Sequence, residues 1–348
     1  MSWPGDSVGP DPALPVGGHG PESQDGIRRQ PLIALLGPTA TGKTEVALRI
    51  AERIGGEIVS MDSRQAYRGM EVGTAAPSAE QRERVRHHGV GFLEPGERYG
   101  AGRFARLARG WIREIAERGR EPLFVGGTGF FYRALVRPIF REPPLDAERR
   151  RRLGAWLAAA DQERLAEWVQ VLDPGLANRL PVLDPQRVQR ALEVAFLTGH
   201  SLSWWQEQGP PEAEPIRARA FVLELDADEH RDRIGDRAER MLDGGWVEEA
   251  RALGAAGLGR ESPALGALGY SAVTDWLDGR ISRADALACI LRDTWGYARR
   301  QRTWLRHQLP EDTVRLDAAE PPDRLADRVI ELARGSGDTA TDGTERKR

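Results

Sequence analysis

The stretch "LIALLGPTATGKTEVALRIA", residues 32–51, decides the fold. A short apolar run ends at Gly37, and a loop leads through Gly42 into a segment with helical spacing, so the stretch predicts strand, loop and helix. It matches the phosphate-binding pattern G-x-x-x-x-G-K-[ST] in that context. Backbone N–H groups and a helix N-terminus make such a loop an anion site, with the lysine as a point charge and the last hydroxyl as a Mg²⁺ ligand. The predicted phosphate loop comprises Gly37, Pro38, Thr39, Ala40, Thr41, Gly42, Lys43 and Thr44.

The segments that follow continue the alternation of strand and helix. Residues 55–62 predict a second strand with Asp62 at its end, residues 103–119 an amphipathic helix, and residues 121–129 a strand that ends in a glycine-rich turn. This alternation predicts an α/β fold, a parallel sheet with helices on both faces. Ligands of such sheets bind beyond the carboxyl ends of the strands, where the phosphate loop, Asp62 and Thr128 all fall.

The rest of the chain divides by composition. Residues 1–30 and 335–348 are rich in small and polar residues and predict disordered tails. Residues 141–215 show helical spacing without an intervening strand, which predicts a helical insertion. A strand at 219–226 and further helices to about 334 then return to the core. The expected organisation is a catalytic core, 31–140 and 216–334, interrupted by the insertion.

Composition limits the classes of function. The chain has 348 residues, 40% of them hydrophobic, and no apolar stretch long enough for a membrane helix, so we expect no membrane partner. One cysteine, Cys289, excludes a disulfide framework and fits a cytoplasmic protein, where it is expected as a small core residue. The net charge of −3 does not exclude a nucleic-acid partner, because arginines cluster locally, as in "YARRQRTWLRHQ" at 297–308.

These residues leave the chemistry open. Asp62 could orient a hydroxyl, accept a proton from an amine as a general base, or cap a helix. The arginines of "DPQRVQRALEV", 184–194, suit phosphate contacts or a solvated helix face equally well. In 297–308, basic side chains alternate with rings that could stack on bases, although an amphipathic helix would give the same pattern.

The order of the motifs resembles one family, the tRNA dimethylallyltransferases, also called tRNA isopentenyltransferases. The resemblance spans about 31–310. It rests on GPTATGKT at 37–44, DSRQAYRGMEVGTAAPS at 62–78, HH at 87–88, GGTGFFYRAL at 126–135, DPQRVQRALEV at 184–194, RIGDRAERMLDGGWVEEA at 233–250, LGYSAV at 268–273 and YARRQRTWLR at 297–306.

This resemblance implies a P-loop NTPase-like parallel sheet flanked by helices, with an inserted all-helical tRNA-binding domain. The implied donor is dimethylallyl diphosphate, the implied acceptor the N6 amine of the adenine 3′ of a tRNA anticodon, the cofactor Mg²⁺ at Thr44, and the molecule a monomer. Catalytic roles are implied for Asp62, as the base, and for Lys43, Thr39 and Arg233. Contacts with the tRNA anticodon stem-loop are implied for Asp62, Ser63, Arg64, Gln65, Thr128, Arg150, Gln186, Arg187, Val188, Gln189 and Arg190.

The chain departs from the family pattern at four places. Gly89-Val90-Gly91 follows the two histidines in place of Leu-(Ile/Leu)-Asp, and Ser271-Ala272 replaces a basic residue and Glu. Trp295 stands where the family has an arginine, and Arg299 stands where it has a lysine.

Three other functions remain possible on the sequence. An adenylate isopentenyltransferase would prenylate free AMP-type nucleotides, but it would not need the insertion. A small-molecule kinase could use the phosphate loop and Asp62, but the sequence contains no recognisable lid-type arginine motif. A catalytically inactive RNA-binding module is disfavoured by the presence of Lys43, Thr44 and Asp62.

Overall fold

A parallel sheet of six strands carries the core. The computed structural model describes residues 31–141, 145–179, 184–259 and 262–335. The tail expected at 1–30 therefore lies outside the described residues, as does the tail expected at 335–348 except for Gly335, which ends a helix. In the sheet the strand order is β3-β2-β4-β1-β5-β6. The strands are β1 Leu32–Leu36, β2 Gly56–Ser60, β3 His87–His88, β4 Glu121–Gly126, β5 Ala218–Glu224 and β6 Val314–Asp317.

The register of the sheet sets the position of the site. Strand β1 is central and pairs in parallel with β4 and β5, so that Leu36 lies opposite both Gly126 and Val222. Because these strands end level with one another, the phosphate loop after β1 and the glycine turn after β4 leave the same edge of the sheet. The predicted α/β class is confirmed.

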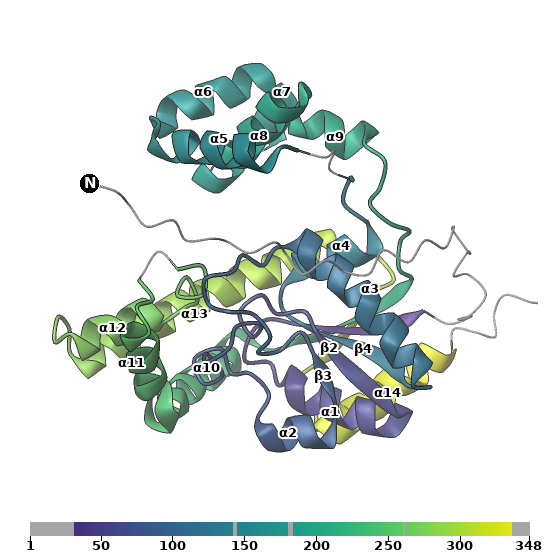
Figure 1. Cartoon of the computed structure of the whole chain (residues 1–348). Coiled ribbons are helices and arrows are strands. Elements are labelled where there is room, and N and C mark those ends of the chain that lie inside the picture. Colours follow the sequence, from purple (N-terminus) through teal and green to yellow (C-terminus); the bar gives the residue numbers. More distant parts are fainter. Residues whose placement is uncertain (1–30, 142–144, 180–183, 260–261, 336–348) are drawn as a thin grey trace, which may run out of the picture.

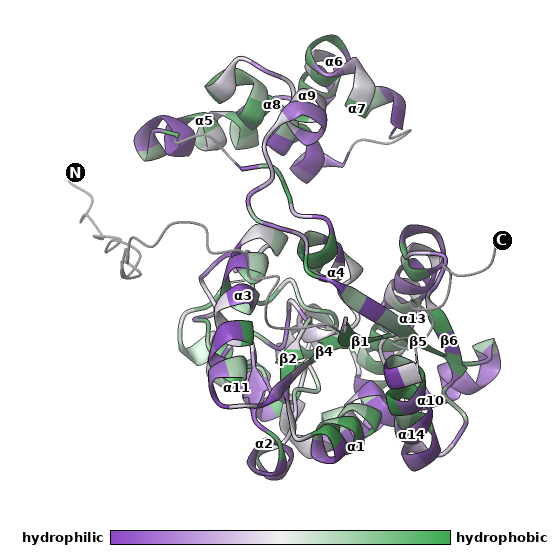
Figure 2. Ribbon diagram, turned by 90° about the vertical axis from the view of Figure 1, so that its right-hand side faces the viewer, coloured by the Kyte–Doolittle hydropathy of each residue, from purple (hydrophilic) through white to green (hydrophobic). Residues whose placement is uncertain are grey.

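Helices cover both faces of the sheet (Figure 1). Helices α1 (Lys43–Ile54) and α14 (Pro322–Gly335) pack against one face, where residues such as Ile50 and Val329 are fully buried. Helices α3 (Ala101–Glu117), α4 (Gly129–Val136) and the end of α13 (Arg283–Gln308) cover the other face. Figure 2 shows the hydrophobic colouring concentrated on the central strands and on the inward sides of these helices.

A third helical group packs beside the sheet around Trp246 and Tyr270. It contains α10 (Ala227–Met241), α11 (Val247–Ala255), α12 (Tyr270–Leu277) and the first half of α13. Between α10 and α11 the chain makes a π-helical turn, Leu242–Trp246, in which Gly245 has a φ of 109°. The glycine pair therefore breaks the continuous helix that the sequence pattern suggests.

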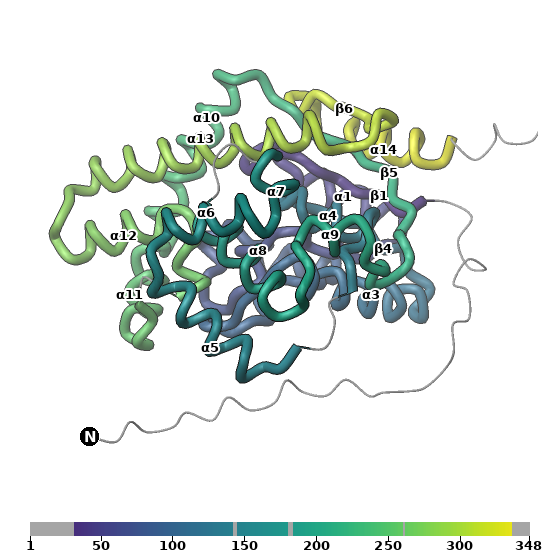
Figure 3. The backbone as a smooth tube through the Cα atoms, turned by 90° about the horizontal axis from the view of Figure 1, so that it is seen from above, coloured from purple at the N-terminus to yellow at the C-terminus, as the bar shows by residue number. Residues whose placement is uncertain are grey.

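The segment predicted as a helical insertion forms its own apolar cluster around Leu157, Val169 and Leu192. Its helices are α5 Ala147–Ala159, α6 Gln162–Leu172, α7 Pro174–Arg179, α8 Pro185–Thr198 and α9 Leu202–Gln208. Aspartate or serine side chains cap four of them, as at Asp146 and Asp184. Figure 1 shows this group beyond α4, joined to the core by two adjacent chain segments, and Figure 3 shows it from above over the middle of the core.

The sequence predicted four of the six strands and overlooked the two at the edges. β3 has only two residues, and β6 is a four-residue strand next to a long helix. A short helix, α2 (Ala79–Arg84), was also not expected. Cys289 is half-buried and packs against the cluster around Trp246, as a core residue would. Within the described residues, no helix is both long enough and apolar enough to cross a bilayer.

Candidate active site

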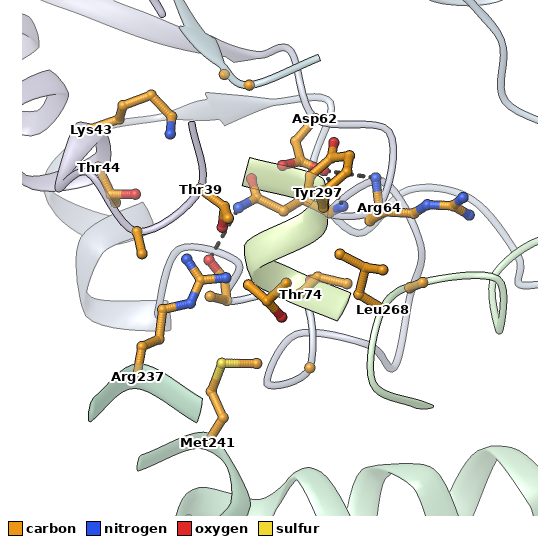
Figure 4. Close-up of a pocket in the computed structure, with 18 of the residues that line it drawn as sticks. Thr39, Lys43, Thr44, Asp62, Arg64, Thr74, Arg237, Met241, Leu268 and Tyr297 are labelled. Carbon is orange, nitrogen blue, oxygen red and sulfur yellow. Dashed lines mark hydrogen bonds between the residues drawn. The ribbon is translucent and has the colours of Figure 1, made fainter. Parts of the chain in front are cut away.

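A cavity of about 780 Å³ opens at the carboxyl edge of the sheet. Its walls come from the phosphate loop, the turn at Asp62, the loop around Thr74, the glycine turn before α4, and helices α10 and α13. Figure 4 shows Lys43, Thr44 and Thr39 at one side, Asp62 and Tyr297 at another, and Met241 farther along the wall. Segments more than 200 residues apart in the chain therefore enclose one space.

The phosphate loop has the conformation that its glycines allow. Gly42 has a φ of 81° and directly precedes α1, whose first residue is Lys43. A Cβ atom at Gly37 would lie 2.8 Å from the carbonyl oxygen of Leu223, so only glycine fits against β5 there. Thr41 Oγ1 and Lys43 Nζ both donate to the carbonyl of Pro38, at 2.9 and 2.6 Å. The loop is thus closed on itself at a helix N-terminus, as expected of an anion site.

Lys43 is strongly affected by its surroundings. Burial lowers the pKa of Lys43 to about 7, with a further decrease from the positive charge of Arg237 and an opposing increase from the carboxylate of Asp62. A lysine in this state gains a proton when an anion arrives, because the anion favours the charged form. The Lys43 side chain is therefore expected to take up a proton when a phosphate binds from solution.

Arg237 is a site residue that the sequence analysis missed. It lines the cavity one helical turn beyond Arg233 on α10, and burial lowers its pKa. In the described parts of the chain its guanidinium has no hydrogen bond or ion pair. Arg233, the residue expected from the resemblance, also lines the cavity but is paired with Glu229 at 2.7 Å. The sequence could have identified Arg237, because Arg233 and Arg237 in "RIGDR" are four residues apart and therefore lie on one face of the helix.

Asp62 follows β2 by two residues and faces the cavity. Its Oδ1 accepts hydrogen bonds from the N–H groups of Arg64 and Gln65, at 2.8 and 3.4 Å. No helix follows directly, so the aspartate orders a turn and does not cap a helix. Its other oxygen, Oδ2, has no hydrogen bond with any described residue, which leaves one carboxylate oxygen for a ligand.

Neighbouring loops hold the Asp62 turn in place. The hydroxyl of Thr128 accepts from the N–H of Ser63 at 3.3 Å. Gln65 accepts from Ser60 Oγ through its Oε1 and donates to the carbonyl of Ala75 through its Nε2, both at 3.1 Å. Gly91, which belongs to the segment 89–91 that differs from the family pattern, also holds this turn: its N–H donates to the carbonyl of Gln65 at 2.9 Å. Ser63, Arg64 and Gln65 all line the cavity, as does Gly127 next to Thr128.

Tyr297 lies beside Asp62 in the cavity wall (Figure 4). Burial, together with the negative charge of Asp62, raises the pKa of Tyr297 to about 12. The phenol therefore stays protonated at neutral pH and can donate a hydrogen bond within the site. From the sequence, Tyr297 was assigned only to the basic aromatic segment 297–308. The spacing of residues in that segment does not show that its first turns reach the cavity.

The remaining residues expected to contact tRNA lie on the insertion and not in the cavity. Arg150 of α5 and Arg190 of α8 come together on Glu193, at 2.7 and 3.0 Å. Gln186 and Arg187 are exposed at the start of α8, and Gln189 donates to the carbonyl of Gly154 at 3.2 Å. Val188 differs from the other residues of this group: it is 2% exposed and packs inside the insertion, so its side chain does not lie at the surface.

Comparisons with known proteins show which family the chain resembles. Residues 65–308 match the family model described as IPP transferase, and residues 30–88 match the model described as Isopentenyl transferase. The chain is 43% identical over 311 residues to the tRNA dimethylallyltransferase of Halorhodospira halophila, covering 88% of this chain and 98% of that one. It is 36% identical over 304 residues to the enzyme of the same name from Geobacillus thermodenitrificans, covering 87% and 95%.

Solved structures are similar as well. The full-length tRNA isopentenylpyrophosphate transferase from Bacillus halodurans aligns with a TM-score of 0.63 at 32% identity, over 88% of this chain and 96% of that one. A eukaryotic dimethylallyltransferase acting on tRNA aligns with a TM-score of 0.76 over 91% and 82%. At 23% identity this second likeness concerns the fold alone.

Proposed function

The chain belongs to the IPP transferase family, and from that premise we propose that it transfers a dimethylallyl group from dimethylallyl diphosphate to a tRNA. The acceptor is N6 of the adenine 3′ of the anticodon, and pyrophosphate is released. The observation that carries the proposal is one cavity that contains both an anion cradle and, across from it, a carboxylate with an oxygen left for a ligand. The two groups correspond to the leaving group and the nucleophile of this reaction.

The diphosphate would bind at the phosphate loop. Its negative charge would be met by the loop N–H groups, Lys43 and Arg237, with Arg233 close to Gly42 at the edge of the loop. Charge neutralisation favours departure of pyrophosphate from an allylic carbon, because negative charge accumulates on the leaving oxygen as the C–O bond breaks.

The same end of the cavity fits a magnesium ion. Mg²⁺ prefers a small number of protein oxygens together with substrate phosphates and water. The Thr44 hydroxyl lines the cavity at the helix N-terminus, and the diphosphate would supply the other oxygens. When bound there, Mg²⁺ would neutralise part of the diphosphate charge.

Asp62 would act on the acceptor. The N6 amine is a weak nucleophile, because its lone pair is delocalised into the purine ring. As the N6–C1 bond forms and the C1–O bond breaks, pyrophosphate leaves with the electron pair, and the N6 proton passes to the free oxygen of Asp62. Tyr297, protonated beside Asp62, would donate a hydrogen bond to the purine or to the Asp62 carboxylate.

An adenine must leave its stack to reach an enclosed carbon atom, so we propose that the nucleotide is flipped into the cavity. The anticodon stem-loop would be held by the exposed arginines of the insertion, among them Arg187, and by the basic face of α13 with Arg299 and Arg300. Phosphate contacts of this kind position an RNA without reading its sequence. The family resemblance also leads us to propose a cytoplasmic monomer.

One assay tests the function. The protein is incubated with Mg²⁺ and dimethylallyl diphosphate, and with unmodified tRNA, AMP or ATP; nucleosides are analysed by mass, and ATP hydrolysis is followed in parallel. We expect N6-dimethylallyladenosine in tRNA digests only. Product on AMP alone would select the adenylate enzyme, whereas ATP turnover without prenyl transfer would indicate a kinase. Salt-sensitive tRNA binding without any product would leave an RNA-binding module.

A further inference from the structure

The backbone of Thr39 in the phosphate loop is held from both sides by residues outside the loop. Its N–H donates to Oε1 of Gln301 at 2.9 Å, and its carbonyl lies 2.7 Å from Nε2 of His230. Gln301 belongs to α13 and His230 to α10, so 262 and 191 residues separate the partners along the chain. Both side chains are buried. A single residue of the anion site is therefore fixed by two helices.

Gln301 also reaches a second loop. Its Nε2 donates to the carbonyl of Gly127 at 2.8 Å, and a Cβ atom at Gly127 would lie only 2.3 Å from that nitrogen. Gly127 precedes Thr128, whose hydroxyl holds the N–H of Ser63 next to Asp62. One amide side chain thus joins the phosphate loop to the loops that carry the proposed base. Both ends of the amide are needed, because one must accept and the other donate.

The tautomer of His230 follows from its neighbours. A carbonyl can only accept, so Nε2 carries the proton and donates it to Thr39, and the unprotonated Nδ1 accepts from Arg302 at 3.0 Å. Burial lowers the pKa of His230, the hydrogen bond to the Thr39 carbonyl opposes this decrease, and the positive charges of Arg302, Lys43 and Arg233 lower the pKa further. The imidazole therefore remains neutral and oriented at neutral pH.

Trp295 completes this arrangement. Its ring contacts His230 edge-to-face at 5.7 Å between centroids, and the guanidinium groups of Arg231 and Arg302 lie over it at 4.6 and 5.8 Å. The tryptophan that departs from the family pattern thus packs against α10 and keeps Arg302 beside the imidazole. Such cation–π contacts are strongest when they are shielded from water.

We infer that His230 and Gln301 are positioning residues that hold the Thr39 backbone in the geometry required to bind the diphosphate. This inference deepens the proposed function and rests on it for the identity of the ligand. Neither residue needs to touch the reacting atoms: each acts through the loop backbone. A preorganised site binds its anion more tightly, because the loop loses less conformational entropy when the ligand binds.

The first test uses magnesium pyrophosphate as the probe, which requires no tRNA and no turnover. Binding is measured by calorimetry for the wild type and for His230→Leu, His230→Gln, His230→Asn and Gln301→Met. A glutamine places its amide near the position of Nε2, whereas an asparagine matches Nδ1 and does not reach Thr39. We therefore expect affinity to fall about tenfold or more in His230→Leu, His230→Asn and Gln301→Met, and by about threefold or less in His230→Gln.

The matched pair of His230 variants separates positioning from packing. Asparagine and glutamine are both polar and uncharged, but asparagine is smaller and leaves a larger cavity at this fully buried position. Urea unfolding of both variants therefore accompanies the binding measurement, because a histidine that only packs would lose affinity in step with the loss of stability. Pyrophosphate affinity that is the same in both variants, or unchanged in His230→Leu, would overturn the inference. Hydrogen exchange of the peptide covering 36–44 should be faster in every variant that loses affinity, and an unchanged exchange rate would also contradict it.

Transfer to tRNA provides the second readout. In the active enzyme we expect His230→Leu and Gln301→Met to raise KM for dimethylallyl diphosphate and lower kcat, with tRNA affinity within about threefold of the wild type. If the wild type forms no prenyladenosine, the proposed function fails, whereas the pyrophosphate and exchange measurements still decide the role of the two residues. A loss of tRNA affinity equal to the loss of pyrophosphate affinity would indicate general unfolding and count against positioning.

Discussion

Lys43 and Arg237 are two cations that have no carboxylate partner of their own among the described residues around the anion site. Burial lowers the pKa of both, and Asp62 is the acidic group whose charge opposes that shift in each. Both side chains are half-buried, and charges that are partly removed from water are costly unless they are paired. Their presence here is best explained by a ligand that supplies the missing charge. Strongly perturbed groups in a cavity are typical of functional sites.

The lowered pKa of Lys43 predicts proton uptake on binding. With a pKa of about 7, Lys43 is largely neutral at about pH 8 before the ligand binds, and the bound diphosphate restores its charge. Affinity for magnesium pyrophosphate should therefore fall as pH rises above that pKa. Calorimetry in two buffers of different ionisation enthalpy should show more proton uptake by the wild type than by Lys43→Met. Equal uptake by the two proteins would refute this account of Lys43.

The contrast between Arg237 and Arg233 predicts unequal effects of equivalent substitutions. Arg237 has no partner among the described residues, whereas Arg233 is already paired with Glu229. We expect Arg237→Met to raise KM for dimethylallyl diphosphate by about 30-fold or more, which corresponds to about 2 kcal/mol. Arg233→Met should raise it by only about threefold. Steady-state kinetics at saturating tRNA measure both, and the reverse order would assign the main role to Arg233.

At the scale of elements, glycines decide how closely the helices approach the loops. A Cβ atom at Gly129, at the start of α4, would lie 2.1 Å from the ring of Trp304 on α13. This contact brings α13 down onto the sheet and thereby brings Gln301 and Tyr297 to the cavity. The packing of α4 against α13 is thus part of the construction of the site.

This packing predicts opposite outcomes for two helical glycines. Gly129→Ala should destabilise the protein by about 1–3 kcal/mol, because Trp304 must move to accept the methyl group. Gly110→Ala in α3 is the control, since a methyl group added there would have no atom of the neighbouring elements within 4 Å, and it should stabilise the protein by about 0.5–1 kcal/mol. Urea unfolding curves measure both changes. A destabilised Gly110→Ala with an unchanged Gly129→Ala would contradict the described packing.

The sequence predicted the elements that periodicity and motif define, and it failed where only tertiary contacts carry the information. The strand before the phosphate loop, the strand before Asp62 and the insertion helices all follow from local pattern. The two edge strands are too short to produce a pattern, and Val188 was named from a motif although its side chain faces inward. Arg237, Tyr297 and His230 became site residues only when α10 and α13 were placed against the loop.

At the scale of the whole molecule, the insertion and the core form separate apolar clusters. The chain leaves and re-enters the core at neighbouring points, because the N–H of Arg141 donates to the carbonyl of Pro210 at 2.7 Å. The insertion can therefore be removed by cutting the chain at only two places, which would separate donor binding by the core from tRNA binding by the insertion. Each part buries its own apolar surface, as independently folding units do.

Removal of the insertion should therefore separate donor binding from tRNA binding. A variant in which a short glycine–serine linker replaces 142–209 should fold and bind magnesium pyrophosphate within about threefold of the wild type. Its affinity for tRNA should fall by about 100-fold or more, because the arginines of α5 and α8 are lost. Filter binding measures the tRNA affinity and calorimetry the pyrophosphate affinity. Undiminished tRNA binding would place the RNA contacts on the core alone.

The most direct measurement is the single-turnover rate of prenyl transfer by Asp62→Asn, with tRNA and dimethylallyl diphosphate both saturating. The amide keeps the size of the side chain and an oxygen for the N–H groups of Arg64 and Gln65, but it cannot take up the N6 proton. We predict a rate lower by about 10²–10⁴-fold, with tRNA affinity within about tenfold of the wild type. A rate within about threefold of the wild type would contradict the assignment of Asp62 as the base.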